Sequence, residues 1–118
     1  MKYMLLIHHG STALPGSPEW DRLSEEDKQA VYTDYQAINQ TPGVTPGMWL
    51  QPPDAATTVR SEGGTTLTTD GPFVAVKEAL GGYLFYEADD LDAAIALAAR
   101  IPAVRLGGGV EIRPIKEG

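Results

Sequence analysis

The chain has 118 residues, with nine basic and sixteen acidic side chains that give a formal net charge of -7 at pH 7. Its length suits a single domain over residues 1–118 with a core of its own, and its acidic balance argues against nucleic acid and anionic membranes as partners. The sequence contains no cysteine, which excludes disulfides, thiolate metal sites and a cysteine nucleophile.

An apolar run over residues 3–8 opens the chain and predicts a strand that is covered on both faces, since it shows no strict alternation. Side chains alternate along a strand, so His8 and His9 would point in opposite directions. The run is too short for a membrane span or a secretory signal core. We therefore predict a cytoplasmic protein.

Two helices are predicted from their capping residues. Residues 10–21 hold several prolines and glycines and are predicted as a loop. Ser24 then begins a capping box, and the helix that follows has an inward stripe and ends near Thr41. Asp89 and its acidic neighbours begin the second helix. The predicted inward stripes are Val31, Tyr35 and Ile38 in the first helix, and Leu91, Ile95 and Ala98 in the second.

The other predicted strands lie between and after these helices. Residues 44–50 contain Pro46 and Gly47, which favour an edge strand or a bulge. Threonine-rich arms on both sides of residues 61–64 predict a hairpin. A connection over residues 75–80 is predicted to be partly helical. The last two predicted strands cover residues 83–87 and 110–115.

The order of these elements predicts an α+β fold, a ferredoxin-like βαββαβ arrangement with an inserted β-hairpin. Two helices can cover only one face of such a sheet, yet the strands at residues 3–8 and 83–86 are apolar on both faces. A bare apolar face of that size is unusual for a soluble monomer. We therefore predict a twofold homodimer that packs sheet against sheet.

The stretch from Asp70 to Tyr83 is the most informative part of the sequence. Asp70-Gly71-Pro72-Phe73 predicts a rigid turn, and Lys77-Glu78 and Gly81-Gly82-Tyr83 follow it. This stretch resembles the DGPF-type members of the YCII-related family. The resemblance extends over nearly the whole chain and includes residues 2–7, 23–26, 50–52, 56–60, 90–94, 99–102 and 110–114.

The resemblance implies a dimeric α+β barrel and no cofactor. Some YCII relatives catalyse eliminations or isomerisations of small ring compounds, and genes of DGPF-type members often lie near those of alternative sigma factors. The chain departs from the family pattern in two places. Ala75 stands where an acid is common, and residues 24–41 contain no histidine, so the His and Asp pair of the broader family cannot be transferred.

His8 and His9 are the candidate catalytic residues, because they are the only histidines and histidine titrates near neutral pH. Either one could act as a general acid or base, with Asp70 as the carboxylate that orients it. The alternatives are a core histidine, a solvated histidine, and an Asp70 that bonds only its own turn. The two histidines are adjacent, which does not suit a metal site.

A small-ligand pocket is predicted from aromatic and methionine side chains, namely Tyr35, Met48, Trp49, Phe73 and Tyr86. Lys77 could bind an anionic ligand. The alternatives are that the apolar residues form core or dimer interface, and that Lys77 lies on a solvated surface.

Two functions stay open from the sequence. The first is a cofactor-free lyase or isomerase that uses histidine acid/base chemistry in a cleft formed by the dimer. The second is a non-catalytic module that binds a metabolite or regulates a protein, in a setting linked to sigma-factor signalling.

Overall fold

The computed structural model describes residues 1–9, 18–73 and 80–117, which form an α+β protein with antiparallel sheets. The main sheet has the strand order β2-β5-β1-β6. Its strands are β1 (Lys2–His8), β2 (Val44–Trp49), β5 (Leu80–Glu87) and β6 (Gly109–Pro114). This order, with the helices between the strands, is compatible with a ferredoxin-like fold.

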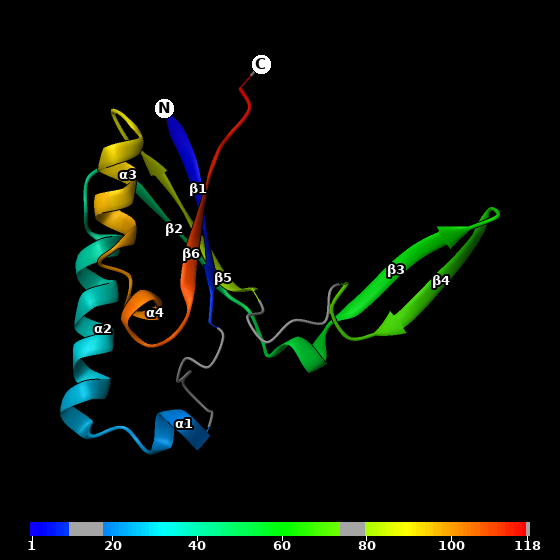
Figure 1. Cartoon of the computed structure of the whole chain (residues 1–118), viewed down its shortest axis with the longest axis horizontal. Coiled ribbons are helices and arrows are strands. Elements are labelled where there is room, and N and C mark those ends of the chain that lie inside the picture. Colours follow the sequence, from blue (N-terminus) through cyan, green and yellow to red (C-terminus); the bar gives the residue numbers. More distant parts are fainter. Residues whose placement is uncertain (10–17, 74–79, 118) are drawn as a thin grey trace.

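The helices lie on one side of this sheet (Figure 1). They are α2 (Glu25–Asn39), α3 (Leu91–Ala98) and α4 (Pro102–Arg105), with the short α1 (Pro18–Asp21) before α2. Ser24 caps α2 as predicted, because its hydroxyl accepts a hydrogen bond from the amide of Asp27 at 3.0 Å. None of the helices in the described ranges is both long and apolar enough to cross a membrane.

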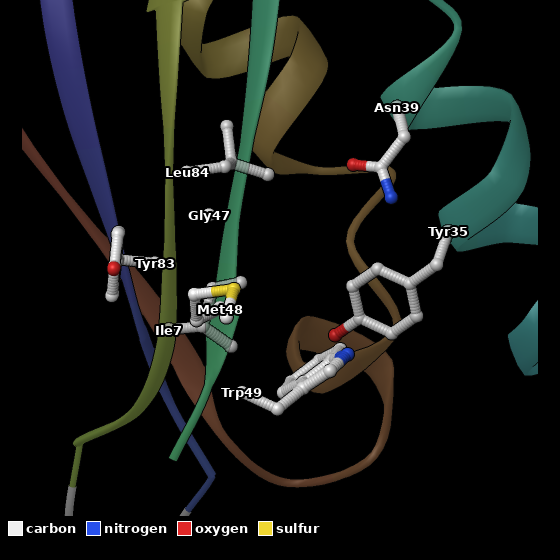
Figure 2. A pocket seen from close by; sticks show the side chains of 8 residues that line it. All are labelled: Ile7, Tyr35, Asn39, Gly47, Met48, Trp49, Tyr83 and Leu84. Carbon is white, nitrogen blue, oxygen red and sulfur yellow. The ribbon is translucent and has the colours of Figure 1, made fainter.

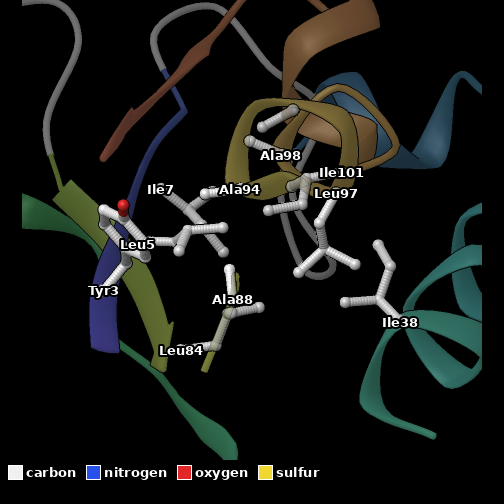
Figure 3. Close-up of a cluster of buried hydrophobic side chains, with 11 residues drawn as sticks. Tyr3, Leu5, Ile7, Ile38, Leu84, Ala88, Ala94, Leu97, Ala98 and Ile101 are labelled. Atoms are coloured by element: carbon white, nitrogen blue, oxygen red, sulfur yellow. The ribbon is translucent and has the colours of Figure 1, made fainter. Parts of the chain in front are cut away.

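Side chains from one face of the sheet and from the helices form the core (Figure 3). Tyr3, Leu5 and Ile7 of β1 point toward the helices and are at most 2% exposed. Ile38 of α2 is fully buried, and Val31 is also buried, as the predicted stripe required. The core therefore occupies the single layer between sheet and helices.

The predicted inward stripe of α3 is wrong for two of its three residues. Leu91 and Ile95 are 50% and 49% exposed. The buried set is spaced i, i+3, i+4 and i+7, and consists of Ala94, Leu97, Ala98 and Ile101. The chain turns from α3 into α4 through Ile101, which is 1% exposed. The helix therefore packs its small-residue face closely and turns two larger side chains outward.

Two other boundaries differ from the prediction. The segment predicted as a loop contains α1, because Pro18 has the backbone angle that suits the first turn of a helix and Trp20 is buried. Strand β5 begins at Leu80 instead of Tyr83. Most of the connection predicted to be partly helical, residues 75–79, lies outside the described residues.

Strand β2 is an edge strand, as predicted. Among the described strands it pairs only with β5, and the register shifts between Pro46 and Trp49. Proline has no amide hydrogen to donate, so an edge position or an irregular register accommodates it. The irregularity brings Trp49 opposite Gly82 of β5.

No helix in the described part of the chain covers the other face of the sheet (Figure 1). Its centre is apolar and half-buried, formed by Met4, Leu6, Tyr83 and Phe85. Charged groups border this centre: the Lys2 ammonium lies 5.8 Å from the ring centroid of Phe85, and Glu111 pairs with Arg113. We call this surface the open face. Its apolar centre continues to favour the predicted sheet-to-sheet dimer.

Strands β3 (Thr57–Glu62) and β4 (Thr65–Asp70) form a separate two-stranded sheet. The turn between them consists of Gly63 and Gly64, with φ of 55° and 82°. Positive φ at both positions gives the turn the twist that suits adjacent antiparallel strands. We call these two strands the arm, because they project from the main sheet on the side away from the helices (Figure 1).

Candidate functional site

His9 directly follows β1 and is only 5% exposed. It continues the alternation of Tyr3, Leu5 and Ile7, so its side chain lies on the helix side of the sheet. Neither ring nitrogen has a hydrogen-bond partner within the described residues. Buried polar groups without a partner are uncommon in native proteins, and each one calls for an explanation.

Two residues fix the position of the His9 ring. A Cβ atom at Gly81 would lie 1.7 Å from Cδ2 of His9 and 2.4 Å from its Nε2, so the ring packs directly on the backbone of β5. On another side, the centroid of the Trp49 ring lies 5.4 Å from the His9 centroid, with an interplanar angle of 36°. The histidine therefore lies between a strand backbone and an indole.

A small pocket lies next to this pair, between α2 and the β2 edge of the sheet (Figure 2). Tyr35 of α2 contacts Trp49 edge to face, with 4.7 Å between the ring centroids. The pocket has a volume of about 40 Å³, which is room for a few waters or for one end of a ligand. Its lining consists of Ile7, Tyr35, Asn39, Gly47, Met48, Trp49, Tyr83 and Leu84.

The outer wall of the pocket is open to solvent. Met48 is 68% exposed and Trp49 is 55% exposed, whereas Tyr35 and Asn39 approach from the helix side (Figure 2). A ligand that enters the pocket could thus extend outward over an apolar rim. The polar groups inside are the Tyr35 hydroxyl and the Asn39 amide, which can each donate and accept hydrogen bonds.

Burial sets the protonation state of two side chains here. It lowers the pKa of His9, and the neighbouring His8 lowers it further. Burial also raises the pKa of Tyr35, although the charge of Arg105 opposes that shift. At neutral pH the site therefore holds a neutral imidazole, which can accept a proton, and a protonated phenol.

This lowered pKa predicts a stability loss in mild acid. The unfolded chain, with His9 near its ordinary pKa of 6.5, binds a proton before the folded chain does. Neutral His9 makes its full contribution to the free energy of unfolding above pH 6.5. Below pH 6.5 this contribution falls by at most about 1.4 kcal/mol per pH unit. Urea unfolding between pH 7.5 and 5 should show the free energy of unfolding decreasing as the pH falls. His9→Gln should make this pH dependence weaker. An unchanged slope in His9→Gln would contradict the assignment.

His8 lies on the opposite side of the sheet from His9, as the alternation predicted. Its Nε2 is 3.5 Å from Oε1 of Glu111, within ion-pair range, but the geometry is not that of a hydrogen bond. Both residues belong to the open face. His8 is therefore part of that surface and not of the pocket.

Two predicted site residues, Asp70 and Phe73, lie away from this pocket. Asp70 is exposed at the end of β4, and neither histidine contacts it. Phe73 is 68% exposed, with the Arg60 guanidinium 4.6 Å from its ring centroid, and does not line the pocket. The turn before it is held by Gly71, whose φ is 106° and whose amide donates to the Ala56 carbonyl at 2.7 Å. Lys77 lies outside the described residues.

The sequence reasoning did not identify Asn39 or Gly81 as site residues. Asn39 gave no signal, since a polar residue at the end of a helix is ordinary. Gly81 did give one, because a glycine inside a strand often marks the close approach of another group. Within the described ranges, no three His, Asp or Glu side chains gather as a metal site would require.

The fold and the pocket together define a small α+β protein with a buried, neutral histidine beside an aromatic pocket. The chain belongs to the YCII-related domain family, whose model matches residues 1–118. It is also similar to an uncharacterized protein of Rhizobium meliloti (strain 1021), with 31% identity over 117 residues, which covers 98% of this chain and 92% of that protein. The resemblance to the YCII-related family noted in the sequence is thereby confirmed.

Proposed function

We propose that the chain is a cofactor-free enzyme of the lyase or isomerase kind, in which His9 accepts a proton from a small molecule bound beside Trp49 and Tyr35. The observation that carries this proposal is that neither ring nitrogen of His9, a side chain only 5% exposed, has a hydrogen-bond partner among the described residues. A buried polar group without a hydrogen bond costs about 1–3 kcal/mol. A ligand that bonds to His9 would remove this cost.

The chemistry of the lining indicates a substrate class. A neutral imidazole offers one acceptor and one donor, and the surfaces around it are mostly apolar and aromatic. These features fit a small, flat, largely apolar compound with a polarised C–H bond, such as one next to a carbonyl. His9 would take the proton as the C–H bond breaks, with the electron pair left on the substrate. Return of the proton to another carbon gives isomerisation, and departure of a leaving group gives elimination.

We further propose that the enzyme is a cytoplasmic homodimer with the barrel architecture expected for the family. The apolar centre of the open face supports this proposal, because its acidic and basic border groups can be self-complementary across a twofold axis. In such a dimer the pocket lined by Trp49 and Tyr35 stays on the outer, helix side of each sheet. The cleft is then supplied by one chain, unlike the shared cleft that the sequence suggested.

The test of His9 uses its matched neighbour as control. Purified protein is screened against a set of small cyclic ketones and lactones by NMR, with ¹⁵N-labelled imidazole groups as the probe. We expect binding to shift the His9 signals and leave those of His8 unchanged. For any compound that turns over, His9→Gln should lower the rate at least about 100-fold, while His8→Gln should retain it. Full activity in His9→Gln would refute the proposal.

A second function, a binding module without catalysis, is favoured by one observation. No carboxylate in the described part of the chain contacts His9 to fix its tautomer, and an acid/base histidine commonly has such a partner. Binding that shifts the His9 signals without any turnover of the bound compound would select this function.

A further inference from the structure

We propose that the arm formed by β3 and β4 packs against a second copy of this chain. This inference rests on the homodimer proposed above and specifies a second region of its interface. The occupant is a second copy because the arm projects from the same side of the main sheet as the open face (Figure 1). A copy that covers the open face would therefore lie beside the arm.

Among the described residues, the arm receives little packing from the rest of its own chain apart from the contact between Arg60 and the Phe73 ring. All its strand residues are exposed except Thr58, which is half-buried at the base. The base is held by two hydrogen bonds of 2.7 Å, from the Thr58 hydroxyl to the Gly71 carbonyl and from the Gly71 amide to the Ala56 carbonyl. Beyond the base, the two strands pair only with each other. Two-stranded sheets of this kind are at best marginally stable in water unless something packs on them.

The amino-acid composition of the arm suits contact with a protein surface better than exposure to solvent. Six of the fourteen residues from 57 to 70 are threonine, and only Arg60, Glu62 and Asp70 are charged. Val59 and Leu67 are 63% and 40% exposed and lie on opposite faces of the arm. Both strands also have an unpaired edge, without the lysines or prolines that usually protect free edges from association. Apolar side chains and free edges together mark a surface that becomes covered.

The surface area of the chain supports the same conclusion. Its accessible surface is 7883 Å², whereas a compact monomer of this length exposes about 6,200 Å². The radius of gyration is 16.1 Å, compared with about 13.5 Å for a compact domain of this length. The excess of about 1,700 Å² per chain exceeds the roughly 800 Å² that each partner contributes to a standard interface. A dimer held by the open face and the arm could bury this excess.

The decisive variant is a shortened arm that lacks residues 59–62 and 65–68. It keeps the Gly63-Gly64 turn, the Thr58 to Thr69 pair and the hydrogen bonds at the base. Sedimentation equilibrium should give a dimer for the natural chain and a dissociation constant at least tenfold higher for the shortened chain. Circular dichroism checks that the main sheet and helices remain folded.

A pair of double substitutions tests the same contact without a deletion. Val59→Glu with Leu67→Glu should weaken the dimer at least tenfold. The matched control, Leu91→Glu with Ile95→Glu, changes two half-exposed apolar residues on α3 and should leave the dissociation constant within about threefold. In both variants the net charge changes equally, so general repulsion cannot explain a difference between them.

Hydrogen exchange provides a readout at the arm itself. In the dimer, edge amides of residues 57–70 should exchange more slowly than in the open-face variant Leu6→Glu, which should be a monomer. If Leu6→Glu dissociates the dimer but the shortened chain dimerises as tightly as the natural one, the role of the arm is refuted and the open-face dimer stands. A natural chain that is monomeric at 100 μM would refute both.

Discussion

Gly81→Ala should destabilise the protein by about 1–3 kcal/mol, the range of an overpacked core, and displace His9 from its position. The reason is the close packing of the imidazole on β5, since the added Cβ would meet Cδ2 of His9 at 1.7 Å. The register between β1 and β5 shifts at Gly81, but the Gly81 carbonyl accepts a hydrogen bond from the Leu50 amide at 2.8 Å. This bond opposes movement of the strand, so we expect the His9 ring to move. Urea unfolding gives the stability change, and the imidazole NMR signals of His9 report its displacement.

Gly109→Ala is the matched control for this prediction. Gly109 also lies in a strand of the main sheet, but a Cβ there would have no heavy atom within 4 Å. Its stability should change by less than about 0.5 kcal/mol, as is usual for surface changes without strain. Equal effects of the two substitutions would show that His9 does not pack on Gly81. The same result would remove the structural basis of the proposed active site.

Leu5→Ala should cost about 3 kcal/mol, within the range of 2–5 kcal/mol seen for large-to-small changes in cores. Leu5 is fully buried at the centre of β1, opposite Leu84 of β5 and Ile112 of β6. The helix layer above cannot collapse fully into the space that its side chain leaves. Denaturant unfolding measures the decrease in the free energy of unfolding. This decrease should not change with protein concentration as long as the oligomeric state of the chain stays the same.

Leu6→Ala tests the open face of β1, whereas Leu5→Ala tests the core face of the same strand. Leu6 is half-buried on the open face, so in an isolated chain its removal should cost less than about 1 kcal/mol. In the proposed dimer, its cost should instead appear as weaker association. The unfolding midpoint should then fall, relative to that of the natural chain, more at high protein concentration, where the natural chain is dimeric, than at low concentration, where both chains are monomeric. A small, concentration-independent effect would contradict the sheet-to-sheet dimer.

Much of the fold follows from local features of the sequence. Ser24 begins α2 because its hydroxyl can satisfy a free amide of the first turn, and this interaction needs no distant residue. Pro46 limits β2 to an edge for a similarly local reason. The opposite orientations of His8 and His9 follow from the alternation of side chains along a strand. Such features depend on bonds and angles within a few residues, so the sequence alone contains them.

The positions of other residues depend on contacts between distant parts of the chain. The sequence predicted Leu91 and Ile95 as the inward residues of α3, but the turn into α4 through Ile101 selects the alanine-rich face instead. Asp70 is the first residue of the family motif, yet it lies exposed at the base of the arm and makes no hydrogen bond to His9. Helix rotation and hairpin direction are set by packing, which no local pattern records.

The sequence by itself determined the family, the α+β class and the opposite orientations of the two histidines. Each of these three conclusions depends on the periodicity of side chains within one segment, or on motifs that occur in a fixed order along the chain. Only the tertiary structure decided that His9 is the histidine that packs on Gly81 and Trp49, and that the arm stands apart from the core. The physical reason is that burial and partner contacts arise between segments far apart in the chain, and these contacts set which polar groups are left unsatisfied.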